Sequence, residues 1–359
     1  MKRLLLIIAG IAVSFGSLAW AMKDTDLQAL SDSLREINYL YTFPMFLLLF
    51  LFYWLKAVRW SWLLQPAKEL TPNQLFRPLV IGFAANNILP AHLGEFVRVF
   101  VVNRQFQIPA STVLSTVVLE RILDIVAILT LFASGIWYAN EMPPEYQNVA
   151  VTVAVVCGGM VAAVVIYLFR TQFFISLTRE ILRFIPFVPT ALSSKVLKML
   201  EQGAVGLQAL KSPLMILKLQ INSLAQWLLN GLSACIALWA LEIDVDFSTG
   251  LILTGITAFG VMIPAAPGYF GVIQVCFIVA MKAQSLQPDD ADVLAASFFL
   301  QVPAYIVVTA AGVFFMQQLG LNLKQMTKSP AAEQDSVAAQ GDELSNPGSP
   351  PTDNTQANS

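Results

Sequence analysis

Two stretches, LPAHLGE at residues 89–95 and IPAAPGYFG at residues 263–271, decide the fold of this chain. Each places proline and glycine in the middle of an apolar segment, 74–104 or 248–282, where proline interrupts the helical hydrogen-bond ladder. We therefore predict that each segment forms two half-length helices meeting at a break within the membrane. Paired breaks of this kind indicate a transporter-like site near the bilayer midplane. A purely structural kink is the alternative.

The composition around these breaks is that of an integral membrane protein. Hydrophobic residues make up 57% of the 359 residues and charged residues 12%, whereas soluble domains are about half apolar and about a quarter charged. Six further apolar runs are each about 20 residues long or more, which suits a hydrocarbon core of ~30 Å. We predict spanning helices at residues 4–22, 43–64, 112–138, 148–169, 214–241 and 293–318. The first run also fits a cleavable secretory signal.

Basic residues gather in the loops on one side of these helices, which marks that side as cytoplasmic. The loops on the other side are mainly acidic. The charge bias holds only if each broken segment returns to its own side of the membrane, so the two hairpins must enter from opposite sides. The predicted fold is therefore an all-α polytopic membrane protein with six spanning helices and two inverted re-entrant hairpins. It lies in the inner membrane with both termini cytoplasmic.

The predicted transmembrane domain covers residues 1–320. Residues 321–359 are rich in Ser, Pro, Asn, Gln and Asp and predict a disordered cytoplasmic tail. Residues 23–42 have helical apolar spacing that indicates a short helix at the outer interface. The cytoplasmic connection at 171–211 begins with a basic amphipathic pattern, typical of a helix on anionic lipid or of a plain packing helix.

Several charged residues fall inside the predicted spans and hairpins. A charge at the bilayer centre costs at least about 2.5–3.5 kcal/mol, so its retention requires a partner or a watery cavity. Glu120 and Asp124 lie one turn apart on one face of the third span, and Glu95 and Arg98 share a face of the first hairpin. The charged candidates are Arg59, Glu95, Arg98, Glu120, Arg121 and Asp124.

Two interpretations of these charges are open. They can form an ion-pair network that only fixes helix packing. Alternatively, the arginines hold the anionic head group of an amphiphile in a cavity, since guanidinium groups match phosphate geometry. We favour the cavity, because the arginines cluster beside a broken helix. Arg59 alone can instead snorkel to the interface.

Uncharged polar residues add further candidates. His92, at the first break, can carry a proton or serve as a plain hydrogen-bond partner. Asn222 and Gln226 belong to a polar stripe along the fifth span, which either joins helices by hydrogen bonds or lines a head-group path. The second hairpin contributes Pro264, Gly268, Gly271 and Gln274.

Catalytic and metal motifs are absent from the sequence. A single histidine excludes a His-rich metal site and leaves no persuasive Ser-His-Asp spacing. The three cysteines, Cys157, Cys235 and Cys276, show neither metal-ligand nor disulfide spacing. We therefore expect no catalytic residue, metal, cofactor or nucleic-acid partner.

Taken together, these motifs resemble the membrane domain of the lysylphosphatidylglycerol synthase and flippase-like family. The resemblance covers about residues 4–320, and it brings Asn86 and Asn87 into the set of candidate binding residues. Its carriers are Arg59-Trp60 with Leu63-Leu64, NNILPAHLGEFVR at 86–98, Glu120-Arg121 with Asp124, Ser223 with Trp227, and PAAPGYFGVIQ at 264–274.

The resemblance implies a translocase of lipids or lipid-linked compounds. Longer members move an aminoacylated phospholipid made by an attached synthetase domain; no such domain is expected here, so lysyl transfer is not predicted. The chain departs from the family pattern in two places. His92 replaces the usual arginine, and Tyr269 and Gln274 stand where the pattern has Gly-Gly and Glu. These departures leave the substrate open.

Our leading hypothesis is an inner-membrane, flippase-like translocase for an anionic phospholipid or lipid-linked compound. In it, Arg59, Arg98 and Arg121 hold the head group and the neighbouring carboxylates orient them. One alternative is a membrane-embedded transferase acting on lipid-linked precursors, with Glu95 or Asp124 as general base. The other is a non-catalytic partner in envelope lipid or glycan assembly. Membrane lipids are the expected partners, and a homo-oligomer or an envelope-biosynthesis partner is left open.

Overall fold

The computed structural model describes residues 2–23, 25–89, 93–139, 170–184, 212–262 and 265–321, with single positions between 152 and 197. Every regular element in these residues is a helix, which confirms the all-α fold class. The elements are α1 (Lys2–Met22), α2 (Leu27–Glu36), the 3-10 turn η1 (Tyr39–Tyr41), α3 (Thr42–Leu64), α4 (Pro72–Ile88), α5 (Gly94–Phe106), α6 (Ala110–Tyr138), α8 (Thr171–Phe184), α10 (Pro213–Trp239), α11 (Phe247–Gly260), α12 (Val272–Ala283) and α13 (Asp290–Gln318).

The predicted spanning segments are recovered as long helices wherever the structure describes them. Among the described residues, three helices are long and apolar enough to cross a membrane by length and composition: η1 with α3, α10, and α13. Helix α6 has 29 residues, which at ~1.5 Å per residue makes it about 43 Å long. The predicted span at 148–169 lies mostly outside the described residues, as does the predicted tail beyond Leu321.

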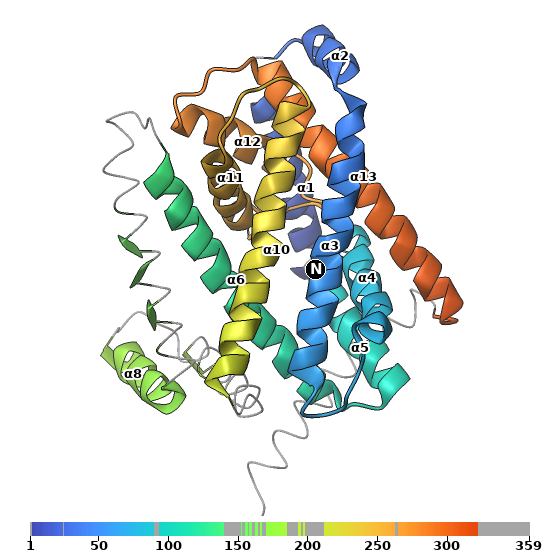
Figure 1. Cartoon of the computed structure of the whole chain (residues 1–359), viewed down its shortest axis with the longest axis vertical. Coiled ribbons are helices and arrows are strands. Elements are labelled where there is room, and N and C mark those ends of the chain that lie inside the picture. Colours follow the sequence, from blue (N-terminus) through green and yellow to red (C-terminus); the bar gives the residue numbers. More distant parts are fainter. Residues whose placement is uncertain are drawn as a thin grey trace, which may run out of the picture.

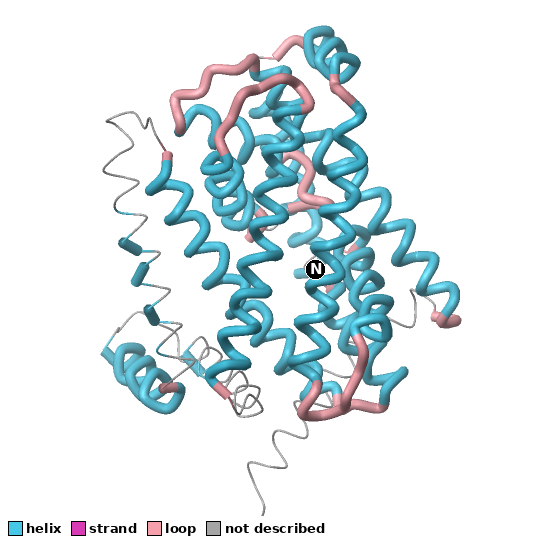
Figure 2. Tube along the Cα trace, viewed as in Figure 1, coloured by secondary structure: helices cyan, strands magenta, loops and turns pink. Residues whose placement is uncertain are grey.

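The two broken segments form hairpins that enter from opposite ends of the bundle. Figure 1 shows α4 and α5 in one half of the molecule and α11 and α12 in the other. The first hairpin packs against α3, α6 and α13, and the second against α1, α6, α10 and α13. The loops of the described residues gather at the two ends of the bundle and at the hairpin breaks (Figure 2). The inverted arrangement is therefore confirmed.

Two glycines bring the limbs of the first hairpin together. Gly94 opens α5, and its backbone N–H donates to Asn86 Oδ1 at 2.7 Å. A Cβ atom at Gly94 would collide with the carbonyl oxygen of Gly82 and with the Asn86 amide. Because only glycine leaves this space empty, the sequence can bend back on itself here. Pro90 and His92, at the break itself, lie outside the described residues.

The second hairpin is closed by contact with α1. Gly271 has φ +89° and lies so close to the Ser14 carbonyl oxygen that a Cβ atom has no room. The hydroxyl of Ser14 accepts a hydrogen bond from the Ala266 N–H at 2.9 Å. A backbone N–H freed at the break therefore finds its partner on α1, as the membrane interior requires. Pro264 lies outside the described residues.

The two predicted amphipathic segments are also helical. Asp26 caps α2, where its carboxylate accepts from the Gln28 N–H at 3.1 Å. In α8, Phe173, Leu177 and Ile181 form an exposed apolar stripe at helical spacing, while Ile175 is buried. Helix α8 thus has an apolar face available to lipid, whereas the exposed residues of α2 are mainly polar, with Leu27 as an exposed apolar side chain.

Candidate functional site

The centre of the molecule holds an ion-pair network that joins α3, α5 and α6. Arg59 on α3 lies 2.7 Å from Asp124 (Nη1 to Oδ1) and 3.2 Å from Glu120 (Nη2 to Oε1). Arg98 on α5 pairs with Glu120, with Nη2 and Oε2 2.9 Å apart. All four residues are at most 2% exposed. The structure thus brings together charges that are distant in sequence, and Arg59 does not snorkel to the interface.

Lys56 belongs to the same network, although sequence reasoning did not single it out. Its Nζ lies 3.5 Å from Asp124 Oδ2 and 3.7 Å from Glu120 Oε1, and the residue is 2% exposed. The sequence feature that could have identified Lys56 is its position within an apolar span, one helical turn before Arg59. This spacing places both side chains on one face of α3.

Positive charge exceeds negative charge at this centre. Among the described residues, the enclosed part of the network contains three cations, Lys56, Arg59 and Arg98, against two carboxylates, Glu120 and Asp124. The Nε donors of both arginines have no hydrogen-bond partner among the described residues. A fixed cation buried without its counterion is costly, so the site favours one further anion.

Arg121 and Glu95 form the accessible edge of the network. The Nε of Arg121 on α6 lies 2.9 Å from Glu95 Oε1 on α5, and their side chains are 41% and 27% exposed. Arg121 Nη1 also approaches Asp124 Oδ2 at 3.8 Å. This pair therefore connects the enclosed charges to the surface beside the first break.

Helix α10 and several aromatic rings complete the surroundings of the charges. Ser223 Oγ accepts from Arg59 Nη1 at 2.5 Å, and Trp227 Nε1 donates to Asp124 Oδ1 at 3.0 Å. The guanidinium of Arg98 lies 4.3 Å from the centre of the Trp60 ring. Such cation–π contacts stabilise a desolvated charge.

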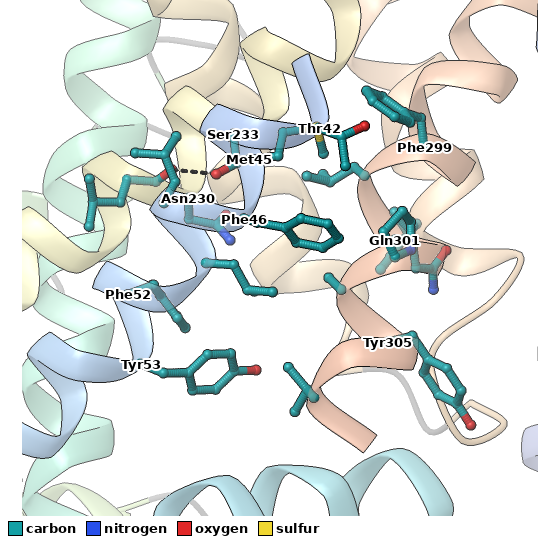
Figure 3. A pocket seen from close by; sticks show the side chains of 18 of the residues that line it. Thr42, Met45, Phe46, Phe52, Tyr53, Asn230, Ser233, Phe299, Gln301 and Tyr305 are labelled. Atoms are coloured by element: carbon teal, nitrogen blue, oxygen red, sulfur yellow. Dashed lines mark hydrogen bonds between the residues drawn. The ribbon is translucent and has the colours of Figure 1, made fainter. Parts of the chain in front are cut away.

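A cavity of roughly 280 Å³ adjoins the network between α3, α10, the second hairpin and α13 (Figure 3). Its described lining is mainly apolar and contains no charged side chain. Two candidates from the sequence, Asn87 and Gly268, line it. Asn230, which continues the predicted polar stripe of Asn222 and Gln226, lines it as well. Sequence reasoning did not find the apolar and aromatic lining residues, because they come from separate elements; they include Phe46, Phe52, Tyr53, Phe299 and Ala304.

An aromatic layer separates this cavity from the charges. Phe52 lines the cavity, and its ring centre lies 5.0 Å from the Lys56 ammonium. Tyr53 also lines the cavity and contacts Phe83, whose ring centre is 5.7 Å from the same ammonium. Lys56 is therefore the cation of the enclosed network that lies directly behind the cavity wall.

Helix α13 ties the tips of the two hairpins together. Thr309 Oγ1 accepts from Asn87 Nδ2 at 2.9 Å, and the Tyr305 hydroxyl donates to the Asn87 carbonyl at 3.1 Å. One turn away, Gln301 donates to the Gly268 carbonyl and accepts from Gln274 Nε2 at 2.9 Å. A displacement of either hairpin must therefore act on α13.

The remaining sequence candidates have separate positions. Asn222 and Gln226 are buried and hydrogen-bonded to each other, with Oδ1 and Nε2 2.5 Å apart. Asn86 and Gly271 shape the two breaks, and Gln274 Oε1 accepts from the Gly271 N–H at 2.7 Å. Two candidates, His92 and Pro264, lie outside the described residues.

An all-α bundle with two hairpins that enter from opposite ends, and with buried charges joining α3, α5 and α6, defines a polytopic membrane protein. The chain belongs to the family described as lysylphosphatidylglycerol synthase TM region, which matches residues 7–312. It is also similar to the glycosyltransferase AglD of Haloferax volcanii, with 24% identity over 287 residues. That alignment covers 72% of this chain and 45% of AglD, so the chain spans less than half of that relative. No solved structure matches the chain.

Proposed function

We propose that this protein is a flippase-like translocase for an anionic phospholipid or an anionic lipid-linked compound. The observation that carries the proposal is the buried excess of one positive charge, at Lys56, Arg59 and Arg98, directly behind an apolar cavity. A phosphate supplies the missing negative charge and accepts from the unused Nε donors. An attached hydrocarbon chain suits the apolar cavity.

The arrangement of the hairpins supports movement of such a lipid. Because the hairpins enter from opposite ends, a shift of each in turn would open the charged centre to opposite leaflets. Helix α13 contacts both tips through Gln301 and Tyr305, so it would couple the two shifts. In this proposal Arg121 and Glu95, at the accessible edge, receive the head group first.

Membership of the family supports a lipid-related role in a membrane. We place the protein in the inner membrane with both termini cytoplasmic, on the basis of the basic loops around Lys68 and Arg104. Membrane lipids are its partners in this proposal. A homo-oligomer or an envelope-biosynthesis partner is compatible with the same mechanism.

The test is the leaflet exposure of labelled lipids in vesicles that contain purified protein. The panel comprises phosphatidylglycerol, an aminoacylated phospholipid, a polyprenyl phosphate and uncharged diacylglycerol. We expect selective movement of one phosphate-bearing class, lost in Arg98→Ala. Arg104→Ala is the matched control, since it removes an exposed arginine from the last turn of the same helix. Failure to move any lipid, or normal movement by Arg98→Ala, would contradict the proposal.

A second candidate function is a membrane-embedded transferase acting on lipid-linked precursors. The similarity to a protein named as a glycosyltransferase favours it. In this candidate Glu95 is the general base, because its carboxylate is the partly exposed one beside the charged centre. Product formation by purified protein supplied with lipid-linked precursor and an activated sugar would support the transferase, and Glu95→Gln should abolish it.

A further inference from the structure

We infer that the cavity between α3 and α13 binds the hydrocarbon chain and linkage oxygens of a phosphate-bearing lipid, with its phosphate beside Lys56. The inference rests on the proposed function and deepens it, because it fixes the place of the chain and the direction in which the lipid points. Four observations carry it: the size and opening of the cavity, two polar groups inside it, its spacing from Lys56, and its direction along α3.

The cavity has the dimensions of a slot for one chain. Its volume of roughly 280 Å³ lies just below the ~300–1,000 Å³ typical of sites that enclose a whole drug-sized ligand. Phe46 on α3 is 38% exposed, and Ala304 on the facing side of α13 is half-buried. Figure 3 shows the Phe46 ring extending from α3 toward α13. The cavity thus opens between two lipid-facing helices, where a hydrocarbon chain can enter from the membrane plane.

Two polar side chains that line this apolar cavity, Tyr53 and Asn230, are free to bind a ligand. Figure 3 shows the Tyr53 hydroxyl and the Asn230 amide directed into the space between α3, α10 and α13. Among the described residues neither side chain has a hydrogen-bond partner. Both groups donate hydrogen bonds, and ester and phosphoester oxygens accept them. A plain hydrocarbon would leave both unsatisfied in an apolar setting, which is unfavourable.

The spacing between Tyr53 and Lys56 matches the spacing between the linkage oxygens and the phosphate of such a lipid. Tyr53 and Lys56 are separated by one helical turn, a rise of about 4.5 Å along α3. In glycerophospholipids and in polyprenyl phosphates, the phosphate directly follows the linkage oxygens or the end of the chain. With the oxygens at Tyr53 and Asn230, the phosphate therefore reaches Lys56, provided that Phe52 turns aside from its position 5.0 Å from the ammonium.

The cavity also gives the lipid a direction. Its lining extends from Tyr53 toward Thr42, at the start of α3, while Lys56 and Arg59 follow toward the other end of that helix. The chain therefore points toward the end where α11 and α12 enter, and the phosphate toward the end where α4 and α5 enter (Figure 1). This is the orientation of a lipid from the leaflet beside the basic loops.

Photocrosslinking in proteoliposomes tests this placement. The probes are phosphatidylglycerol and polyprenyl phosphate, each with a diazirine in its chain, and a diacylglycerol probe with the same diazirine but no phosphate. Mass spectrometry then locates the modified residues. We expect one phosphate-bearing probe to label Phe46 and Phe299, and unlabelled lipid of the same class to compete. Whichever phosphate-bearing probe labels them identifies the source of the phosphate.

Matched variants separate the cavity from the general lipid surface. Ala304→Phe fills the cavity and should abolish labelling of Phe299. Ala310→Phe adds the same side chain to the exposed face of α13 and should leave that labelling unchanged. Tyr53→Phe keeps the ring contact with Phe83 and removes the donor; we expect roughly threefold to tenfold weaker competition by unlabelled lipid.

The outcomes distinguish this inference from the proposed function. Equal labelling by the diacylglycerol probe, or labelling that persists in Ala304→Phe, overturns the inference. Transport of a lipid whose probe never labels the cavity also overturns the inference, but it remains consistent with the proposed translocase function. Selective labelling of the cavity in a protein that moves no lipid supports the binding site and contradicts the proposed translocase function.

Discussion

The Arg98 guanidinium on α5 lies 2.9 Å from the Glu120 carboxylate on α6, and both side chains are buried. This ion pair joins the first hairpin to a helix outside it. Glu120 also contacts Arg59 and Lys56 on α3. The returning limb of the hairpin is therefore attached to two of its neighbours through a single carboxylate.

Removal of this pair as a unit separates its structural role from its functional one. Glu120→Leu alone should lower the free energy of unfolding by about 3–5 kcal/mol, since it leaves the buried Arg98 without its carboxylate. Arg98→Met alone should cost less, because Glu120 keeps its contacts with Arg59 and Lys56. The double variant should regain most of that stability, because one cation and one carboxylate disappear together. Lipid movement should remain at least tenfold reduced in the double variant. Thermal unfolding and the leaflet assay measure the two effects, and normal transport by a stable double variant would exclude Arg98 from head-group binding.

Lys56→Met tests the charge excess directly. It leaves two arginines facing two carboxylates, so the free energy of unfolding should change by less than about 2 kcal/mol despite the complete burial of the side chain. Binding of an anionic lipid should weaken at least tenfold, because the network no longer lacks an anion. Lys56→Arg is the control, since it retains the charge. A large loss of stability with unchanged lipid affinity would show that Lys56 acts only in packing.

Gly94→Ala should disrupt the first hairpin. The added methyl group would occupy the position of the Gly82 carbonyl oxygen, and overpacking of this kind costs about 1–3 kcal/mol or more. Gly16→Ala is the comparison, because a Cβ atom there meets nothing within 4 Å and lies within helix α1. We expect that change to be neutral or stabilising by up to about 1 kcal/mol. Thermal unfolding in detergent measures both, and equal midpoints would contradict the close approach of the two limbs.

Gln301→Leu should loosen the connection between α13 and the second hairpin. The substitution leaves the Gly268 carbonyl without its donor, which costs about 1–3 kcal/mol. It also removes one acceptor of Gln274 Nε2, which keeps Ser297 Oγ at 3.3 Å. Gln317→Leu, at an exposed position of the same helix, should change little. Hydrogen exchange after residue 268 reports the local effect. Exchange that is identical in the two variants would show that Gln301 does not hold the hairpin tip.

Much of the fold could be predicted because a membrane restricts the choices. Apolar runs of spanning length predicted α3 and α13 within a few residues, and loop charges required each hairpin to return to its own side. The breaks at 89–95 and 263–271 marked the hairpins, since proline and glycine are costly inside an uninterrupted helix.

The partners of the charged residues could not be predicted in the same way. Spacing along one helix placed Glu120 and Asp124 on a common face, but it carries no information about which arginine of another helix pairs with each. Lys56 was missed because a lysine in an apolar span can equally reach the interface by snorkelling.

The sequence by itself determined that this is an all-α membrane protein with two inverted hairpins, because hydrophobicity, loop charge and helix-breaking residues act locally along the chain. Only the tertiary structure decided that Lys56, Arg59 and Arg98 surround two carboxylates, and that Tyr53 and Asn230 share a cavity. Those relations depend on how helices rotate and pack against one another. Helix packing results from the summed fit of many side chains across the bundle, which no single stretch of sequence contains.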